Sequence, residues 1–358
     1  MRNLLTGLAC AALLATTVAS AQSPVFTPFG IVPVLDSYLE ALRQQSGIPG
    51  MSAALVRDGE ILWERGYGFQ DVNARIRATP DTPYMIGDAS ATLAAVLLLQ
   101  CVEQRHMDLD RPLGTYGIDM PEPGATLRQL LSHTPSDLAA EPFTYNPGRY
   151  AQLTAAMERC APQPYRKSVS HRILNRLAMQ DSVPGTDFRD PGLALPEGLF
   201  TTAERQRYFD VLQRLAIGYK VDARGRVDHT VVPVEGMSAA GGLVSTVRDL
   251  AKLDGALDTN ILLLDETVAQ AWQPVMSPRG TAVPMGLGWF VQSYRGQRVV
   301  WHFGMVPNAY SSLIIKLPER KLTFILLANS DKLVAPFQIP AGDVSRSLFA
   351  TLFLKLVT

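Results

Sequence analysis

The strand-like segments of this chain gather at its two ends, and that placement limits the folds that it can adopt. Near the start, the apolar runs 51–56 and 61–67 are joined by Asp58-Gly59, a pattern typical of a β-hairpin. Near the end, turn residues separate four further strand-like runs, 288–293, 298–302, 310–316 and 322–328. Distant parts of one chain that both need strand partners are expected to pair in a shared sheet.

The residues between these ends carry helix-period apolar patterns instead, as in 93–104, 150–159 and 203–215. Amphipathic helices are also expected at 33–45 and 344–356. We therefore predict an α+β fold, an α/β sandwich with an antiparallel sheet of about five strands built from both chain ends and flanked by the terminal helices. The sheet portion spans about 33–72 and 286–358, and a mostly helical lobe of about 73–285 is inserted between them. A site between the two portions is expected.

Composition excludes several classes of function. The 33 basic and 33 acidic residues balance, which argues against a nucleic-acid partner. A hydrophobic content of 47% is ample for a packed core. The sequence has no phosphate-binding loop, dinucleotide fingerprint or cluster of metal ligands, so we expect no cofactor and no metal.

The first residues resemble a signal peptide spanning 1–21. Arg2 supplies the positive start, 4–18 is an uncharged apolar run, and Ala19-Ser20-Ala21 is a cleavage site that leaves Gln22 as the mature start. We expect an exported protein, periplasmic or secreted, with no membrane span after cleavage. The alternative is an uncleaved membrane anchor.

Two cysteines, Cys101 and Cys160, follow this leader. Both lie in segments expected to be helical, where small buried thiols are common. An oxidising compartment would also allow them to pair, but sequence does not give their separation. Both outcomes therefore remain open at this point.

Several segments, taken in order, resemble the class C β-lactamase and penicillin-binding-protein family of serine hydrolases. They are IPGMSAALVRDGEILWERGYGFQDV, DTPYMIGDASATLAAVLLLQCVEQRHMDLDRPL, LRQLLSHTPSDL, SAAGGLVSTVRDLAKL, MGLGW and VVWHFGMVPNAYSSLIIKLPERKLTFILLANSD. The resemblance covers about 34–354 and implies one β-lactamase-related domain over 22–354. It also implies chemistry by a Ser-x-x-Lys pair, a Tyr-x-Asn motif and a Lys-Thr-Gly or His-x-Gly strand.

The Ser-x-x-Lys pair is absent. Matching IGDASA to the family pattern puts Asp88 at the nucleophile position and Ala91 at the lysine position. Nowhere in the chain does a serine stand three residues before a lysine. Ser90 is the nearest hydroxyl, but it points to another side of the helix and lacks a basic partner. No catalytic residue is therefore expected to be intact.

The other family motifs are preserved unequally. Tyr145 aligns with the family tyrosine, although Pro147 stands where the family has asparagine; a half-buried aromatic residue beside a loop is the alternative. His302-Phe303-Gly304 fits His-x-Gly, with Gly304 letting a ligand approach the backbone and the Met305 amide pointing into the cleft. The alternative there is a structural glycine beside a surface histidine. His133 belongs to the Ser-His-Thr segment, where a packing role is expected.

Asp88 is expected in the first turn of a long helix, where a carboxylate caps free amides and complements the positive helix end. The same carboxylate could accept the amides that a tetrahedral intermediate needs. It would then be stabilised as an anion and would repel anionic substrates such as β-lactams.

These residues lead to three hypotheses. The first is an exported protein that is inactive in acyl transfer and whose cleft, formed by Asp88, Tyr145, His302, Gly304 and Met305, binds a small molecule or a peptidoglycan fragment. The second is an active esterase, β-lactamase or peptidase with altered catalytic residues. The third is a structural exported protein with a closed cleft. The sequence identifies no protein partner.

Overall fold

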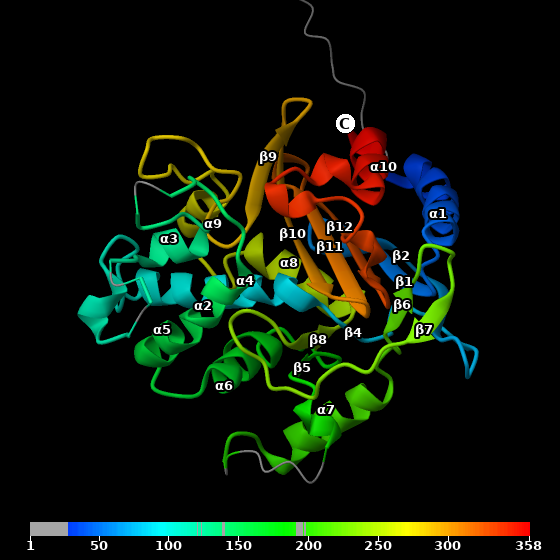
Figure 1. The fold of residues 1–358 in the computed structure, drawn as a ribbon, viewed down its shortest axis with the longest axis horizontal. Helices are drawn as coiled ribbons and strands as arrows, with labels where there is room; N and C mark the ends of the chain where they lie inside the picture. The colour runs from blue at the N-terminus through cyan, green and yellow to red at the C-terminus, as the bar shows by residue number, and fades with distance from the viewer. Residues whose placement is uncertain (1–27, 120, 123, 138–139, 191–195, 197) are drawn as a thin grey trace, which may run out of the picture.

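The computed structural model describes residues 28–119, 121–122, 124–137, 140–190, 196 and 198–358 (Figure 1). The signal peptide predicted over 1–21 lies outside these residues. Within the described residues, no helix combines the length and the apolar character that crossing a membrane requires.

The described residues form a seven-stranded antiparallel sheet in the order β3-β2-β1-β12-β11-β10-β9. The strands are β1 (Gly50–Arg57), β2 (Glu60–Asp71), β3 (Ile76–Arg77), β9 (Phe290–Tyr294), β10 (Gln297–Val306), β11 (Tyr310–Leu317) and β12 (Leu322–Ala328). The predicted fold class is confirmed, with seven strands instead of about five. The two exposed residues of β3 are too few to show the alternation that predicts a strand.

The two ends of the chain meet in the middle of this sheet. β1 pairs with β12, so that Met51 lies opposite Ala328. Every residue of β12, and all of β1 except Arg57, is buried, which indicates helices on both faces of these strands.

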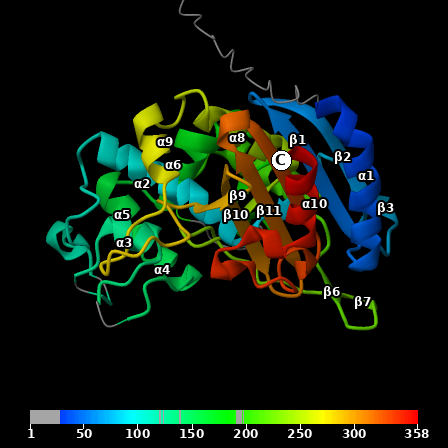
Figure 2. The same ribbon diagram turned by 90° about the horizontal axis from the view of Figure 1, so that it is seen from above.

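Neighbouring side chains of β12 show which helix covers which face. Phe324 stacks on Phe353 of α10 (Leu348–Val357), with ring centroids 4.8 Å apart. The adjacent Thr323 accepts a hydrogen bond from Lys316, which also contacts Asp254 of α8 (Val247–Leu257). Because successive strand side chains point to opposite faces, α10 covers one face and α8 the other. Helix α1 (Pro28–Gln45) packs beside α10 and β2 (Figure 2).

The middle of the chain forms the helical lobe. Its helices are α2 (Ala91–Glu103), α3 (Leu127–Leu131), α4 (Pro147–Ala151), α5 (Leu153–Cys160), α6 (Tyr165–Val169), α7 (Thr202–Gln213) and α9 (Asp265–Ala271). Two small sheets accompany them, one of β4 (Tyr84–Met85), β5 (Val183–Pro184) and β8 (Leu243–Ser245), the other of β6 (Tyr219–Val221) and β7 (Val227–His229). Residues 91–101 of α2 are all buried, so this helix is the centre of the lobe.

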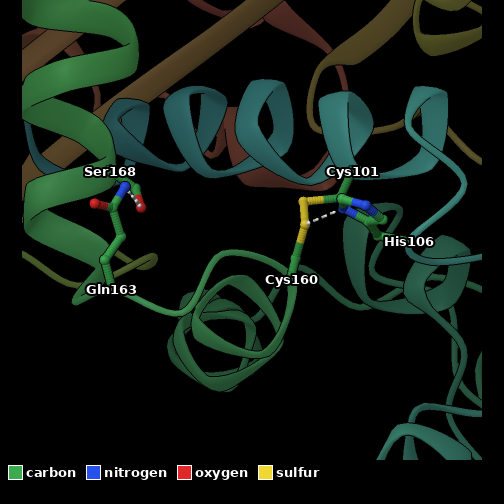
Figure 3. Close-up of a disulfide and its surroundings, with 5 residues drawn as sticks. All are labelled: Cys101, His106, Cys160, Gln163 and Ser168. Atoms are coloured by element: carbon green, nitrogen blue, oxygen red, sulfur yellow. Dashed lines mark hydrogen bonds between the residues drawn. A yellow bond between two sulfur atoms is a disulfide. The ribbon is translucent and has the colours of Figure 1, made fainter.

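A disulfide bond joins Cys101 of α2 to Cys160 at the end of α5 (Figure 3). The two cysteines are 59 residues apart in the sequence, and their Cα atoms are separated by 6.2 Å. The structure therefore decides between the two outcomes that the sequence left open. The bond ties the central helix of the lobe to the helix that packs across it.

Candidate functional site

Asp88 lies in a short 3₁₀ helix, η1 (Gly87–Ser90), that leads into α2. Gly87 has a φ of +58°, and a Cβ added to it would lie 2.5 Å from the backbone nitrogen of Met305. This close approach seats η1 directly on β10. The backbone amide of Met305 is close enough to the Asp88 carboxylate to favour its ionised form. The expected helix cap is not formed, because neither η1 nor α2 begins with a side-chain cap and the carboxylate faces β10 instead.

Burial controls the charge of Asp88. Removal from water raises the pKa of this carboxyl to about 7, although the nearby Met305 amide acts to lower it. The expected stabilisation as an anion is therefore wrong, because one amide does not offset the loss of hydration. The carboxyl changes protonation state close to neutral pH.

The two positions that follow Asp88 in the family pattern offer no chemistry. Ala91 is buried, and its methyl group is neither nucleophile nor base. The Ser90 hydroxyl donates to the carbonyl of Gly87 at 2.7 Å and accepts from the Leu243 amide at 3.2 Å. It holds the turn together, as expected of a residue without a catalytic role.

Tyr145 lies within an aromatic cluster. Its half-buried ring is 4.7 Å from His133, 5.1 Å from Phe303 and 5.3 Å from Phe290, measured between ring centroids. Burial, with a smaller contribution from the negative charge of Asp88, raises the pKa of Tyr145 well above its ordinary value. The phenol therefore stays protonated. Tyr145 is within electrostatic reach of Asp88, and its ring packing fits the alternative of a half-buried aromatic residue.

Pro147, at the position of the family asparagine, begins α4. The preceding Asn146 caps this helix by accepting a hydrogen bond from the Gly148 amide at 3.0 Å. A helix start thus occupies the place of the Tyr-x-Asn motif.

His302 is buried, so the alternative of a surface histidine is wrong. Its Nδ1 donates to the carbonyl of Phe303 at 2.7 Å, which leaves Nε2 as the acceptor of the neutral ring. That Nε2 is buried and has no hydrogen-bond partner among the described residues. Burial lowers the pKa of His302 to about 4, and the ring is therefore neutral at physiological pH. Its centroid lies 6.5 Å from that of Tyr145.

Gly304 is required by the protein's own backbone. A Cβ at this position would lie 1.8 Å from the carbonyl oxygen of Ile86 and 2.7 Å from Oγ of Ser312. Ser312 also donates a hydrogen bond to that carbonyl at 2.8 Å. The space that a side chain at position 304 would need is therefore filled by the Ile86 carbonyl and Ser312, which fits the alternative of a structural glycine, and the close approach of a ligand stays a prediction.

His133 has the expected packing role. It is buried with a φ of +53°, its Nδ1 accepts from the Asn146 amide at 3.2 Å, and its ring stacks on Tyr150 at 4.9 Å. Burial lowers the pKa of this imidazole to about 3.

A small cavity of about 40 Å³ lies behind His302, between β10, β11, α2 and α8. Its walls include Trp272, Trp289 and Trp301, and its polar edge includes Lys316. Lys316 is buried and donates to Asp254 at 3.0 Å and to Asp258 at 2.8 Å. The prediction of site residues missed this ion pair. A lysine within the apolar strand 310–317 was the signal that could have revealed it.

The described residues include no group of three or more histidine, cysteine, aspartate or glutamate side chains that could hold a metal ion. The structure thus places Asp88 against the Met305 amide of β10, and the ring centroid of Tyr145 lies 5.1 Å from that of Phe303 and 6.5 Å from that of His302. This constellation can hold or release a proton and can accept hydrogen bonds, but it includes no activated hydroxyl.

The chain matches the family model described as Beta-lactamase over residues 35–342. It is 23% identical to the putative penicillin-binding protein PbpX of Bacillus subtilis, over 73% of this chain and 67% of that protein. It is 21% identical to protein flp of Staphylococcus aureus, over 84% of this chain and 64% of that protein. The chain thus spans about two thirds of the length of these relatives.

Solved structures share the fold. The octameric penicillin-binding protein homologue of Pyrococcus abyssi superposes with a TM-score of 0.71 and 22% identity, covering 90% of this chain and 77% of that one. The D-amino acid amidase of Ochrobactrum anthropi SV3, complexed with L-phenylalanine amide, gives 0.67 and 20%, covering 90% and 98%.

Proposed function

Because this chain belongs to the β-lactamase family, we propose that it is an exported member that keeps the fold and has given up acyl transfer. In this proposal, Asp88 and Ala91 stand where active members have the nucleophilic serine and its lysine. The cleft around Asp88 retains a binding role for a small molecule or a peptidoglycan fragment.

The observation that carries the proposal is the position of the Asp88 carboxylate in η1, which packs against β10 so closely that the Met305 amide acts on its pKa. The family resemblance assigns this strand amide to the oxyanion hole. To reach this amide, a tetrahedral intermediate would have to displace the Asp88 carboxylate, which the protein chain itself holds in place. Preorganised amides accelerate acyl transfer only when they are free for the developing oxyanion.

The neighbouring groups supply no replacement chemistry. Ser90 is committed to two hydrogen bonds, Ala91 is a methyl group, and Tyr145 holds its proton. Attack by Asp88 itself would give a mixed anhydride without a base to assist it. Losing the nucleophile of such a unit costs factors of about a million, or about 8 kcal/mol in activation free energy.

Export is supported by the disulfide between Cys101 and Cys160, because such bonds persist in oxidising compartments. The apolar start of the sequence, with its small-residue cleavage site, points the same way. We therefore propose a periplasmic or secreted location.

The test is covalent labelling of the folded protein with a fluorescent penicillin and with a fluorophosphonate, using an active class C β-lactamase as the positive control. The expected result is no adduct on this chain under conditions that label the control fully. Stoichiometric labelling would overturn the proposal.

Turnover assays separate this proposal from that of a hydrolase with rebuilt chemistry. Nitrocefin, p-nitrophenyl esters and D-Ala-D-Ala peptides should be hydrolysed at background rates. Any residual rate should be unchanged in Asp88→Asn and His302→Ala. A rate that falls in both variants would instead identify an active hydrolase.

A gain-of-function pair tests the assignment of the two positions. Asp88→Ser combined with Ala91→Lys should acquire slow penicillin labelling, while the matched control Asp88→Ser alone should not. Labelling of the single variant to the same extent would show that another base serves this site.

A further inference from the structure

A second hollow lies at the far end of α2, about 20 Å from Asp88 along the helix at its usual rise per residue. It has a volume of about 500 Å³ and is lined by the end of α2, by the residues that follow α6, and by the loop at 260–264. Its lining residues do not include Asp88, Tyr145, His302, Gly304 or Met305.

The wall that follows α6 carries two arginines without counterions. Arg172 is half-buried and Arg176 is exposed, and neither forms an ion pair or hydrogen bond with the described residues. Other charges around the hollow are already engaged: His171 faces Glu204 at 3.5 Å, and Glu103 accepts the Leu264 amide at 2.8 Å. Burial and the charge of Arg176 lower the pKa of Arg172, as expected for two cations held near each other. With two arginines against the single carboxylate of Glu103, the hollow keeps a net positive charge.

Arg172 lies in a π-helical turn, η3 (Ser170–Leu174). The turn is closed by the hydrogen bond from the Asn175 amide to the carbonyl of Ser170 at 2.8 Å. An inserted residue of this kind interrupts the regular α-helical ladder and recurs at functional sites.

A buried acceptor supplies an independent observation. Gln100 lines the hollow and is only 6% exposed. Its Nε2 donates to the carbonyl of Leu262 at 2.8 Å, while its Oε1 has no partner among the described residues. A buried carbonyl oxygen without a donor is costly, and a ligand hydroxyl that reached it would remove that cost. Beside it, the apolar side chains of Ile261 and Leu264 are 42% and 48% exposed.

We propose that this hollow binds a small phosphate monoester that carries a hydroxyl group and an apolar portion. The two guanidinium groups would hold the phosphate, whose double charge and several acceptor oxygens suit a pair of arginines. Gln100 would take the hydroxyl hydrogen, and Ile261 with Leu264 would cover the apolar portion.

The experiment is calorimetric titration of the full chain with inorganic phosphate, phenyl phosphate and glycerol 3-phosphate, at an ionic strength held constant with sodium chloride. Both organic phosphates should bind more tightly than inorganic phosphate. Arg172→Gln and Arg176→Gln should each weaken binding by about tenfold. The matched control Arg205→Gln, on the exposed face of α7, should leave binding unchanged.

Thermal unfolding without phosphate distinguishes loss of the site from loss of the fold. Arg172→Gln should unfold at the same or a higher temperature than the native chain, because a like-charge contact is relieved. Equal phosphate affinity in the native chain and both pocket variants would overturn the proposal. The proposal would also be overturned if phosphate raised the unfolding temperature of the native chain only as much as sodium chloride does at the same ionic strength.

A lipid headgroup could present the same phosphate monoester. Flotation with phosphatidylcholine vesicles, with and without phosphatidic acid, separates this source from a soluble phosphate. Binding that needs phosphatidic acid and is lost in Arg172→Gln would support the site and assign its ligand to a membrane surface. Vesicle binding that both variants retain would overturn it.

Discussion

At the scale of single residues, the site is governed by what burial does to titratable groups. Asp88 and His302 both lose hydration on folding, but they respond in opposite directions. The carboxyl pKa rises to about 7 and the imidazole pKa falls to about 4, so each group favours its neutral form. Because burial favours the neutral form of both groups, the site suits binding through hydrogen bonds better than nucleophilic attack.

Asp88→Asn should stabilise the protein at alkaline pH. The folded pKa of Asp88 is raised, so ionisation opposes folding: no penalty exists below about pH 4, it grows as the pH rises, and it is complete above about pH 7. The variant should therefore gain about 2–4 kcal/mol in free energy of unfolding at pH 8 and almost nothing at pH 4. Urea unfolding of both proteins across this range checks it, and a pH-independent difference would contradict it.

His302→Leu should stabilise the protein in acid. The folded pKa of His302 is lowered, so protonation of this histidine opposes folding. The native chain loses no stability from it above about pH 6.5, and it loses free energy of unfolding progressively as the pH falls towards 4. The variant should gain about 3 kcal/mol relative to the native chain between pH 6.5 and 4. His229→Leu, at an exposed position, is the matched control and should show no such trend. Parallel pH profiles for the native chain and His302→Leu would refute the argument.

At the scale of elements, the junction between η1 and β10 decides the geometry of the site. The carbonyl of Ile86 lies against Gly304, and the hydroxyl of Ser312 on β11 donates to it. Three separate segments thus meet without space for a side chain at position 304. This contact, and not a ligand, explains the glycine of the His-x-Gly motif.

Gly304→Ala should therefore damage folding. Its methyl group would overlap the Ile86 carbonyl, and relieving the overlap requires η1 to move away from β10. We expect a loss of about 3 kcal/mol in free energy of unfolding. Gly124→Ala is the control, because its added Cβ has no neighbour within 4 Å. Equal stability of the two variants in urea would show that η1 adjusts without cost.

At the scale of the whole molecule, two long-range connections hold the chain together. The pairing of β1 with β12 joins strands from the two ends of the chain at the middle of one sheet. The disulfide between Cys101 and Cys160 cross-links α2 to α5 within the helical lobe. The first connection is made by backbone hydrogen bonds, and the second depends on the redox state of the surroundings.

Breaking the disulfide should lower stability measurably. The bond closes a loop between residues 59 apart, for which loop-closure entropy predicts about 4 kcal/mol, with less if strain or residual structure intervenes. Cys101→Ala with Cys160→Ala should unfold at lower urea concentration than the oxidised native chain. Dithiothreitol should destabilise only the native chain, and equal sensitivity of both proteins would contradict this role.

Much of the fold could be predicted because its signals are local. Apolar runs separated by turn residues marked strands in 51–67 and 298–328, and helix-period patterns marked the buried helix at 91–103. The two-residue strand at 76–77 was missed because its pairing depends on its neighbour β2 and leaves no pattern of its own. The same limit applies to Lys316, whose carboxylate partners lie on a helix some 60 residues earlier, beyond any local motif.

The sequence by itself determined the family, the fold class and the identity of the residues at the altered positions, because motif order and periodicity are properties of the chain alone. Only the tertiary structure decided that Asp88 faces the Met305 amide instead of capping its helix, that His302 is buried, and that Cys101 reaches Cys160. Each of these depends on the distance and hydration of groups far apart in the chain. Packing in the folded protein sets both the distances and the hydration, and neither can be derived from local sequence patterns.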